Sequence, residues 1–184
     1  MLTLRTIACL ALLSSVAVAD TATERHRPGL EVNVLWPFFP GGIFEMRYVA
    51  PLLRADERAF HGSIVAGVYS DFASRVVRTE EHGKVGNLSV KLGWRQYFVH
   101  GLHLEVSANA GWRREVMRPN TTVDPIDGFQ IRLWFLPGIE YDFSSRFYVN
   151  ARGAVGLHIL RTGPLGEQEK KVAAGGDLNF GVRF

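Results

Sequence analysis

The chain has 184 residues, 47% of them hydrophobic, and a formal net charge of +3 at pH 7. This length suits one domain, and a charge that is the small difference between 21 basic and 18 acidic residues gives no reason to expect nucleic-acid binding. Arginine outnumbers lysine 17 to 4, which favours fixed pairing with carboxylates or phosphates over a diffuse solubilising coat.

The first residues have the pattern of an export signal. Arg5 precedes an apolar run over residues 7–18, which ends in the small-residue sequence Ala17-Val18-Ala19. This pattern is typical of a signal peptide cleaved after Ala19, so the expected barrel domain is residues 20–184. The run is too short to span a bilayer comfortably, and no later segment approaches ~20 uninterrupted apolar residues. Any membrane insertion therefore has to use strands.

The only cysteine, Cys9, lies inside this apolar run. We therefore expect the exported chain to contain no disulfide, no cysteine-based zinc site and no thiol nucleophile.

Apolar and polar residues alternate from residue 30 onward, in segments of about ten residues separated by turn-forming residues. A period of two over such segments is typical of transmembrane β-barrel strands. The clearest segments are 88–95, 102–113, 129–142, 147–159 and 172–184, and three weaker ones are 30–36, 43–52 and 60–70. Pro37 and Pro40 interrupt the first hairpin, because proline cannot donate to a ladder. The pattern predicts eight strands.

The connections favour a barrel over a soluble sandwich, which would also alternate. Tight connections are expected at 100–101 and 144–145 with a modest one at 54–59, and long polar ones at 71–83, 116–127 and 161–170. Short turns at one end and long loops at the other are the asymmetry of outer-membrane barrels, whose long loops lie outside the cell.

Aromatic residues are sorted by strand end in this topology. Those at the short-turn end are Phe98, Tyr141, Phe143, Phe147, Phe180 and Phe184, and those at the loop end are Trp36, Phe38, Trp112 and Phe129. Two such groups indicate interfacial girdles, because the core of a sandwich would not sort its rings in this way.

With these features the chain resembles the small outer-membrane β-barrels, a superfamily that includes the transmembrane domain of OmpA and the OmpX-like proteins. The resemblance is most specific in residues 178–184, an alternating strand that ends in phenylalanine. It implies an all-β, eight-stranded antiparallel up-and-down transmembrane β-barrel in the cell outer membrane. It also implies that Phe180, Val182 and Phe184 form the signal read by the barrel-assembly machinery, and that outer-membrane lipid and lipopolysaccharide surround the protein.

The interior of an eight-stranded barrel is just wide enough to be filled by side chains. The predicted inward face has seven cations and six anions: Arg47, Lys91, Arg95, Arg113, Arg132, Arg152 and Arg183 with Glu31, Glu45, Glu105, Glu140, Asp142 and Asp177. Buried charges need partners, so this near balance predicts a salt-bridge network that largely closes the lumen. We therefore expect a structural or surface-interaction protein, with a narrow pore for small solutes as the alternative.

A lipid A- or phospholipid-modifying enzyme is a further alternative, since some outer-membrane barrels hydrolyse lipids with histidine and serine. The chain offers His61 with Ser63, and His103 with Ser107. Same-face neighbours on one strand lie ~6.6 Å apart, so a catalytic triad would need partners from adjacent strands. Neither pair matches a motif of such enzymes, and no phosphate loop, zinc or calcium motif is present. We expect no catalytic residue, cofactor or metal.

Mixed charges are expected at the loop end. The residues are Arg75, Arg78, Arg114, Arg118, Arg161, Lys170 and Lys171 with Glu80, Glu81, Glu115, Glu167 and Glu169. Arginine matches the geometry of phosphate, so this rim suits contact with lipopolysaccharide or with an extracellular ligand. A solvated rim of mixed charge without a ligand is the favoured interpretation of these residues, and contact with phosphate is the alternative.

Overall fold

The computed structural model describes residues 27–35, 43–52, 62–71, 82–117, 126–163 and 172–184. Eight strands make up most of these residues: β1 (Gly29–Asn33), β2 (Ile43–Pro51), β3 (Gly62–Asp71), β4 (His82–Tyr97), β5 (Leu102–Met117), β6 (Ile126–Asp142), β7 (Phe147–Arg161) and β8 (Val172–Arg183). Each strand pairs antiparallel with the next, and β8 pairs with β1 to close the barrel. The predicted all-β, eight-stranded up-and-down barrel is confirmed. Within the described ranges, no helix is long and apolar enough to cross a membrane.

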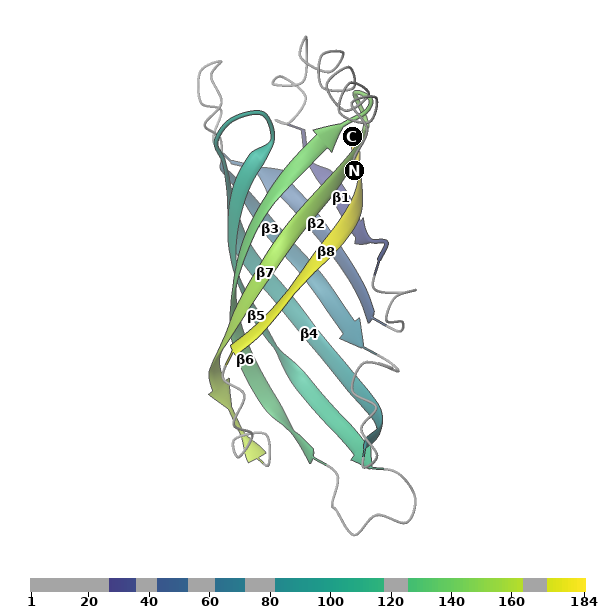
Figure 1. Ribbon diagram of the computed structural model, residues 1–184, viewed down its shortest axis with the longest axis vertical. Coiled ribbons are helices and arrows are strands. Elements are labelled where there is room, and N and C mark those ends of the chain that lie inside the picture. The colour runs from purple at the N-terminus through teal and green to yellow at the C-terminus, as the bar shows by residue number, and fades with distance from the viewer. Residues whose placement is uncertain (1–26, 36–42, 53–61, 72–81, 118–125, 164–171) are drawn as a thin grey trace, which may run out of the picture.

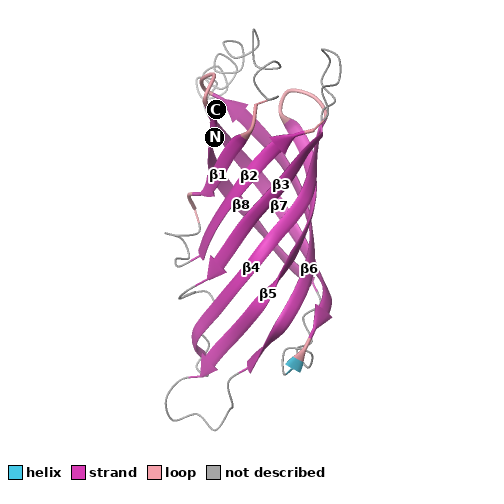
Figure 2. Cartoon of the chain, turned by 180° about the vertical axis from the view of Figure 1, so that it is seen from behind, coloured by secondary structure: helices cyan, strands magenta, loops and turns pink. Residues whose placement is uncertain are grey.

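The strands are tilted against the barrel axis, and the two ends of the barrel differ (Figure 1). The β4–β5 and β6–β7 turns lie at one end, together with the start of β1 and the end of β8. β4, β5, β6 and β7 are 16, 16, 17 and 15 residues long, whereas about 9–11 tilted residues cross a bilayer. These four strands extend the wall at the opposite end, as the view from behind also shows (Figure 2).

The four long strands β4 to β7 run further toward that opposite end than the alternation predicts, and the difference is largest for β4 and β5. β4 begins at His82 rather than at residue 88, and β5 continues to Met117, with which His82 pairs. The hydrophobic alternation fades there because a wall beyond the bilayer needs no apolar outer face, while the backbone ladder continues. The predicted connections 71–83 and 116–127 are therefore shorter than expected.

β1 is shorter than predicted and ends at Asn33 instead of residue 36. The Asn33 side-chain oxygen accepts a hydrogen bond from the Leu35 amide at 3.0 Å, an Asx turn that ends the extended segment. Trp36, the two prolines of the first hairpin and the predicted connection at 54–59 lie outside the described residues.

The two shortest connections are tight turns, as predicted. His100 and Gly101 have φ values of 49° and 80°, the left-handed conformation that two-residue hairpin turns require and that glycine adopts easily. In the β6–β7 turn, the Ser144 hydroxyl accepts hydrogen bonds from the amides of Arg146 and Phe147 at 3.3 and 3.0 Å. Both turns therefore follow from local sequence.

Along the strands, polar side chains are buried and apolar side chains are exposed, which is the reverse of the arrangement in a water-soluble protein. On β4, Leu88, Val90 and Leu92 are 65%, 62% and 63% exposed, while Ser89 and Lys91 between them are buried. A closed barrel with an apolar outer surface and a polar interior fits a membrane barrel, because lipid contacts the outer side chains while the closed ladder satisfies the backbone.

Aromatic side chains gather on the outer surface at the short-turn end. The rings of Phe143, Phe147 and Phe180 lie 5.8 to 6.3 Å from one another, and those of Tyr48 and Phe184 lie 6.3 Å apart. All five side chains are exposed. Of the predicted loop-end group, Trp112 is exposed on β5, and Trp36 and Phe38 lie outside the described residues.

Candidate functional site

Polar side chains fill the barrel interior. Every strand contributes at least one buried polar residue, and residues paired across two strands point to the same face. The registers of β1–β2, β4–β5 and β7–β8 oppose three charged pairs directly: Glu31 with Arg47, Arg95 with Glu105, and Arg152 with Asp177. Pairing of neighbouring strands alone therefore brings these opposite charges together, without any contact across the lumen.

Glu31 is the centre of the network. Its Oε2 accepts a hydrogen bond from Arg47 Nη2 at 2.5 Å, and its two oxygens accept from Arg95 Nη1 and Nη2 at 2.6 and 2.9 Å. The Tyr148 hydroxyl and the Asn150 amide donate to Oε1 at 3.1 and 3.3 Å. Because Glu31 is fully buried, these donors replace the water that the carboxylate loses on folding.

Glu105 is the second centre. Its Oε2 accepts hydrogen bonds from Arg95 Nε and Nη2 at 3.1 and 2.9 Å, from Arg152 Nη1 at 3.0 Å, and from Arg47 Nη1 at 3.3 Å. Arg152 also forms a two-pronged contact with Asp177, with Nε 2.8 Å from Oδ1 and Nη2 bonded to Oδ2. Bidentate contacts of this kind fix both distance and orientation.

Arg183 joins two carboxylates at the short-turn end. Its Nη1 lies 2.5 Å from Asp142 Oδ1, and its Nη2 donates to Glu140 Oε1. The Tyr97 hydroxyl donates to Glu140 Oε2 at 2.6 Å, and the Arg183 guanidinium lies 4.2 Å from the centre of the Tyr148 ring. This end of the lumen is therefore filled by ion pairs and tyrosine rings together.

Glu45 closes the network on its other side. It is bonded to Lys91, and its carboxylate lies 3.8 Å from Arg47 Nε and 3.7 Å from Arg152 Nη2. We call the whole set the lumen network: Glu31, Glu45, Arg47, Lys91, Arg95, Glu105, Glu140, Asp142, Arg152, Asp177 and Arg183. Its members come from β1, β2, β4, β5, β6, β7 and β8.

Inward glycines make room for the arginine stems. A Cβ atom at Gly67 of β3 would lie 2.7 Å from Arg47 Cγ, and one at Gly138 of β6 would lie 2.6 Å from Arg152 Cγ. Both distances are shorter than side-chain packing allows. The two arginines therefore lie against the wall where it has no side chain.

Arg132 and Arg113, also predicted as network members, lie toward the long-connection end. Arg132 Nη2 donates to Gln130 at 3.4 Å, and its guanidinium lies 5.2 Å from the centre of the Trp134 ring. The described residues give Arg132 no carboxylate partner. Arg113 is opposite Asn87 in the β4–β5 register. We call this part of the interior the loop half of the lumen.

A β-bulge brings a further arginine into the loop half. Arg132 is opposite His158, whereas Ile131 is opposite Leu160, so Ile159 is an extra residue of β7. The extra residue changes the facing of those that follow, and Arg161 lies inward with Nη2 3.2 Å from His158 Nε2. Arg161 lies at the loop end of β7, as predicted. Its inward facing follows from the bulge, which an unbroken alternation does not reveal.

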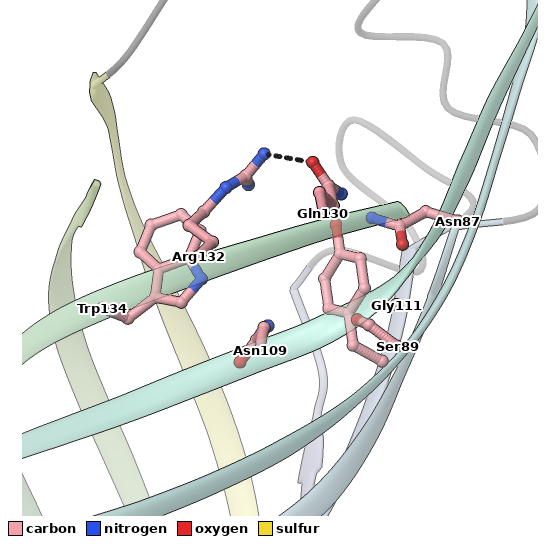
Figure 3. Close-up of a pocket in the computed structure, with 8 residues that line it drawn as sticks. Asn87, Ser89, Asn109, Gly111, Gln130, Arg132 and Trp134 are labelled. Carbon is pink, nitrogen blue, oxygen red and sulfur yellow. Dashed lines mark hydrogen bonds between the residues drawn. The ribbon is translucent and has the colours of Figure 1, made fainter. Parts of the chain in front are cut away.

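A cavity of about 20 Å³ lies in the loop half. Its lining residues are Tyr69, Asn87, Ser89, Asn109, Gly111, Gln130, Arg132 and Trp134 (Figure 3). Arg132 and Gln130 share their hydrogen bond at one side of this space (Figure 3). Within the described ranges, no three histidine, cysteine, aspartate or glutamate side chains form a group that could hold a metal ion.

No family model, curated protein or solved structure matches this chain. The functional assignment therefore rests on the fold and on the chemistry of the lumen.

The histidine and serine pairs singled out in the sequence are only partly described. His103 Nδ1 lies 3.1 Å from the Gly101 carbonyl oxygen. In the described part of the chain, His103 Nε2 and the hydroxyls of Ser63 and Ser107 are buried and have no hydrogen-bond partner. These groups therefore do not form the serine–histidine hydrogen bond that activates a nucleophile. His61 lies outside the described residues.

The site also has neutral members, of which the alternation placed Asn150 and Asn179 on the polar face, whereas Tyr97 and Tyr148 were not predicted. Tyr97, Tyr148 and Asn150 donate hydrogen bonds to the buried carboxylates, and Asn179 donates to Asp177 at 2.8 Å. All four occupy the same strand face as the predicted charges, so the alternation carried the signal. The two tyrosines did not stand out because their rings are apolar, and only the hydroxyl groups mark them as donors to the buried carboxylates.

Proposed function

We propose that this protein is a structural or surface-interaction protein of the cell outer membrane, with a lumen that the network largely closes to solutes. The lumen network is the observation that supports this proposal. Buried ion pairs from seven strands hold one another through bidentate contacts, so moving one charge leaves its partners unpaired in a low-dielectric interior. A water-filled channel would instead leave such charges hydrated.

The outer surface and the strand ends support a role at the membrane surface. The exposed apolar residues and the aromatic cluster at the short-turn end suit a lipid environment. At the opposite end, the exposed Arg114 on β5 suits contact with phosphate groups of lipopolysaccharide. The other rim charges predicted for this role, including Arg75, Arg78 and Arg118, lie outside the described residues.

Conductance measurements test the closed lumen. We expect the wild-type protein, reconstituted in a bilayer containing lipopolysaccharide, to show little steady conductance and to release no fatty acid. Glu140→Ala should raise conductance, because it leaves Arg183 with one carboxylate fewer and removes the partner of Tyr97. Arg132→Ala should also raise conductance, because it removes a guanidinium group that lines the lumen. Arg146→Ala is the matched control, since it removes an exposed charge in the β6–β7 turn and should leave conductance near the wild-type level.

Two results would favour the alternatives. A large wild-type conductance would support the narrow pore. Release of fatty acid that Ser63→Ala or Ser107→Ala abolishes would support a lipid-modifying enzyme.

A further inference from the structure

The β6–β7 turn carries an arginine that has no carboxylate partner among the described residues. Arg146 is exposed in this turn, which lies at the short-turn end of the barrel (Figure 1). Glu140 and Asp142, which precede the turn, are buried in the lumen and joined to Arg183. An exposed guanidinium group presents a fork of N–H donors that matches phosphate, so Arg146 is available to an anion outside the barrel.

Two serines of the same turn add hydrogen-bond donors. The Ser144 hydroxyl oxygen already accepts hydrogen bonds from the amides of Arg146 and Phe147. A hydroxyl group has two acceptor sites and one proton, so what Ser144 has left for a ligand is its proton. Ser145 is exposed beside it, and residues 143–147 contain no acidic residue. The turn therefore offers a positive charge and several donors, which suits a ligand whose oxygen atoms only accept.

The backbone of the turn is held in place by the barrel. The Arg146 carbonyl oxygen accepts a hydrogen bond from the Arg183 amide at 2.7 Å. The Phe147 carbonyl oxygen accepts from the amides of Phe143 and Ser144 at 3.2 and 3.3 Å. The turn is thus fixed to the end of β8, and only side chains have to be ordered when a ligand binds. A site whose backbone is already ordered loses less entropy on binding.

An exposed aromatic surface adjoins the turn. The rings of Phe143 and Phe147 are stacked, 6.3 Å apart with 11° between their planes, and the Phe180 ring lies 6.0 and 5.8 Å from them. All three side chains are exposed on the outer wall, and aromatic rings in that position lie at the level of the lipid headgroups. A phosphate group bound by the turn would therefore have apolar rings beside it, which suits a phospholipid better than free phosphate.

We propose that the β6–β7 turn binds one anionic phospholipid of the surrounding membrane. Its phosphate contacts Arg146 and the two serines, and the first carbons of its acyl chains lie against the three rings. The site rests on the proposed membrane location of the protein. An anionic headgroup is favoured over a zwitterionic one, because the ammonium group of the latter would lie beside a guanidinium group with no carboxylate to receive it. The β4–β5 turn, residues 98–101, contains no arginine, so we expect no equivalent site there.

Native mass spectrometry of the intact protein in neutral detergent tests this proposal. The wild type should retain one phosphatidylglycerol at concentrations at which it retains little phosphatidylcholine. Arg146→Gln removes one exposed charge pair and should weaken the apparent affinity for phosphatidylglycerol about fivefold. Arg146→Lys keeps the charge without the fork and should lose less. Phe143→Ala should weaken the retention of both lipids equally. Arg27→Gln removes another exposed arginine, next to the start of β1, and should leave the affinity unchanged.

Equal retention of the two lipids by the wild type would overturn the site. An equal loss in Arg146→Gln and Arg27→Gln would also overturn it, because it would show a diffuse attraction to the charge of this end. Displacement of phosphatidylglycerol by an equal concentration of inorganic phosphate would do the same, since the rings would then add nothing.

A failure of the membrane location itself gives a different result. A protein that is not a membrane barrel would stay soluble without detergent and retain neither lipid, which would refute the site together with the location. The heat-modifiable band shows whether each variant is folded. If Arg146→Gln does not fold, the preference of the wild type for phosphatidylglycerol over phosphatidylcholine decides the question.

Discussion

Glu31 shows how one residue holds several strands together. It belongs to the five-residue strand β1, yet its carboxylate accepts hydrogen bonds from Arg47 on β2, Arg95 on β4 and Tyr148 on β7. The contacts with Arg95 and Tyr148 couple β1 to strands with which it does not pair. The short ladders of β1 are thereby supplemented by side-chain contacts.

Glu31→Ala should destabilise the folded barrel strongly. Removing one partner of a buried ion-pair cluster leaves Arg47 and Arg95 undercompensated, which costs about 3–5 kcal/mol. Unfolding in denaturant, followed through the heat-modifiable band in electrophoresis, measures the change. The control is Arg146→Ala, an exposed charge in the β6–β7 turn, for which a change within about 0.5 kcal/mol is expected. Equal stability of the two variants would contradict a central role for Glu31.

Gly67→Ala tests whether the wall must lack a side chain beside Arg47. The new methyl group would lie 2.7 Å from Arg47 Cγ and 2.6 Å from the Met46 carbonyl oxygen, so either the strand or the arginine has to shift. Overpacking of this kind costs about 1–3 kcal/mol. Gly153→Ala is the matched control, because the nearest atom to its methyl group, on Pro137, is 3.8 Å away. The thermal midpoint of the folded band should fall for Gly67→Ala alone.

Strand β8 has one face of polar residues in the lumen and an opposite face of aromatic residues on the outer surface. Asn179 and Arg183 are buried in the lumen, whereas Phe180 and Phe184 are exposed on the outside. The Phe184 amide donates to the Pro28 carbonyl at 3.1 Å, but the ring contributes only to the edge of the outer aromatic surface. We therefore expect the Phe184 ring to contribute little to the free energy of unfolding.

Deleting Phe184 should impair assembly more than stability, because the terminal aromatic resembles the insertion signal of outer-membrane barrels. We expect the heat-modifiable band to disappear from outer membranes, while the purified variant still refolds in detergent. Phe143→Ala removes another exposed aromatic side chain of the same surface and should assemble normally. Normal membrane assembly without Phe184 would count against the proposed signal.

For the whole molecule, the distribution of polarity requires an apolar surrounding. The barrel closes through the β1–β8 pair, the interior contains the charges, and the outer surface exposes leucine, valine and aromatic residues. Such a surface is unfavourable in water and suited to lipid. In this arrangement the Phe180 side of β8 faces lipid and the Asp177 side faces the lumen.

Cysteine labelling in membranes tests this orientation. A bilayer-restricted reagent should react with Phe180→Cys, whose side chain faces outward, and should not react with Asp177→Cys, whose position is bonded to Arg152 in the lumen. Ala174→Cys, at another exposed outward position, serves as the positive control. The reverse labelling of the first two variants would show that the inner and outer faces are exchanged.

The sequence by itself determined the strand count, the faces and the tight turns. A strand points successive side chains to opposite sides, so the alternation from Val172 to Phe184 carries its own orientation without knowledge of the neighbours. The turn at Gly101 is equally local, because it depends on the conformations of two adjacent residues. The charged residues predicted to face inward were found in the same way.

Only the tertiary structure decided which charges contact one another and where the lumen network ends and the loop half of the lumen begins. Glu31 contacts Arg95 because of the registers and tilt of the whole barrel, which no single strand specifies. The bulge at Ile159 turns Arg161, at the loop end of β7, toward the lumen. Arg132 was separated from the carboxylates because contacts across a barrel depend on the positions of all eight strands, whereas alternation depends only on the residue before and the residue after.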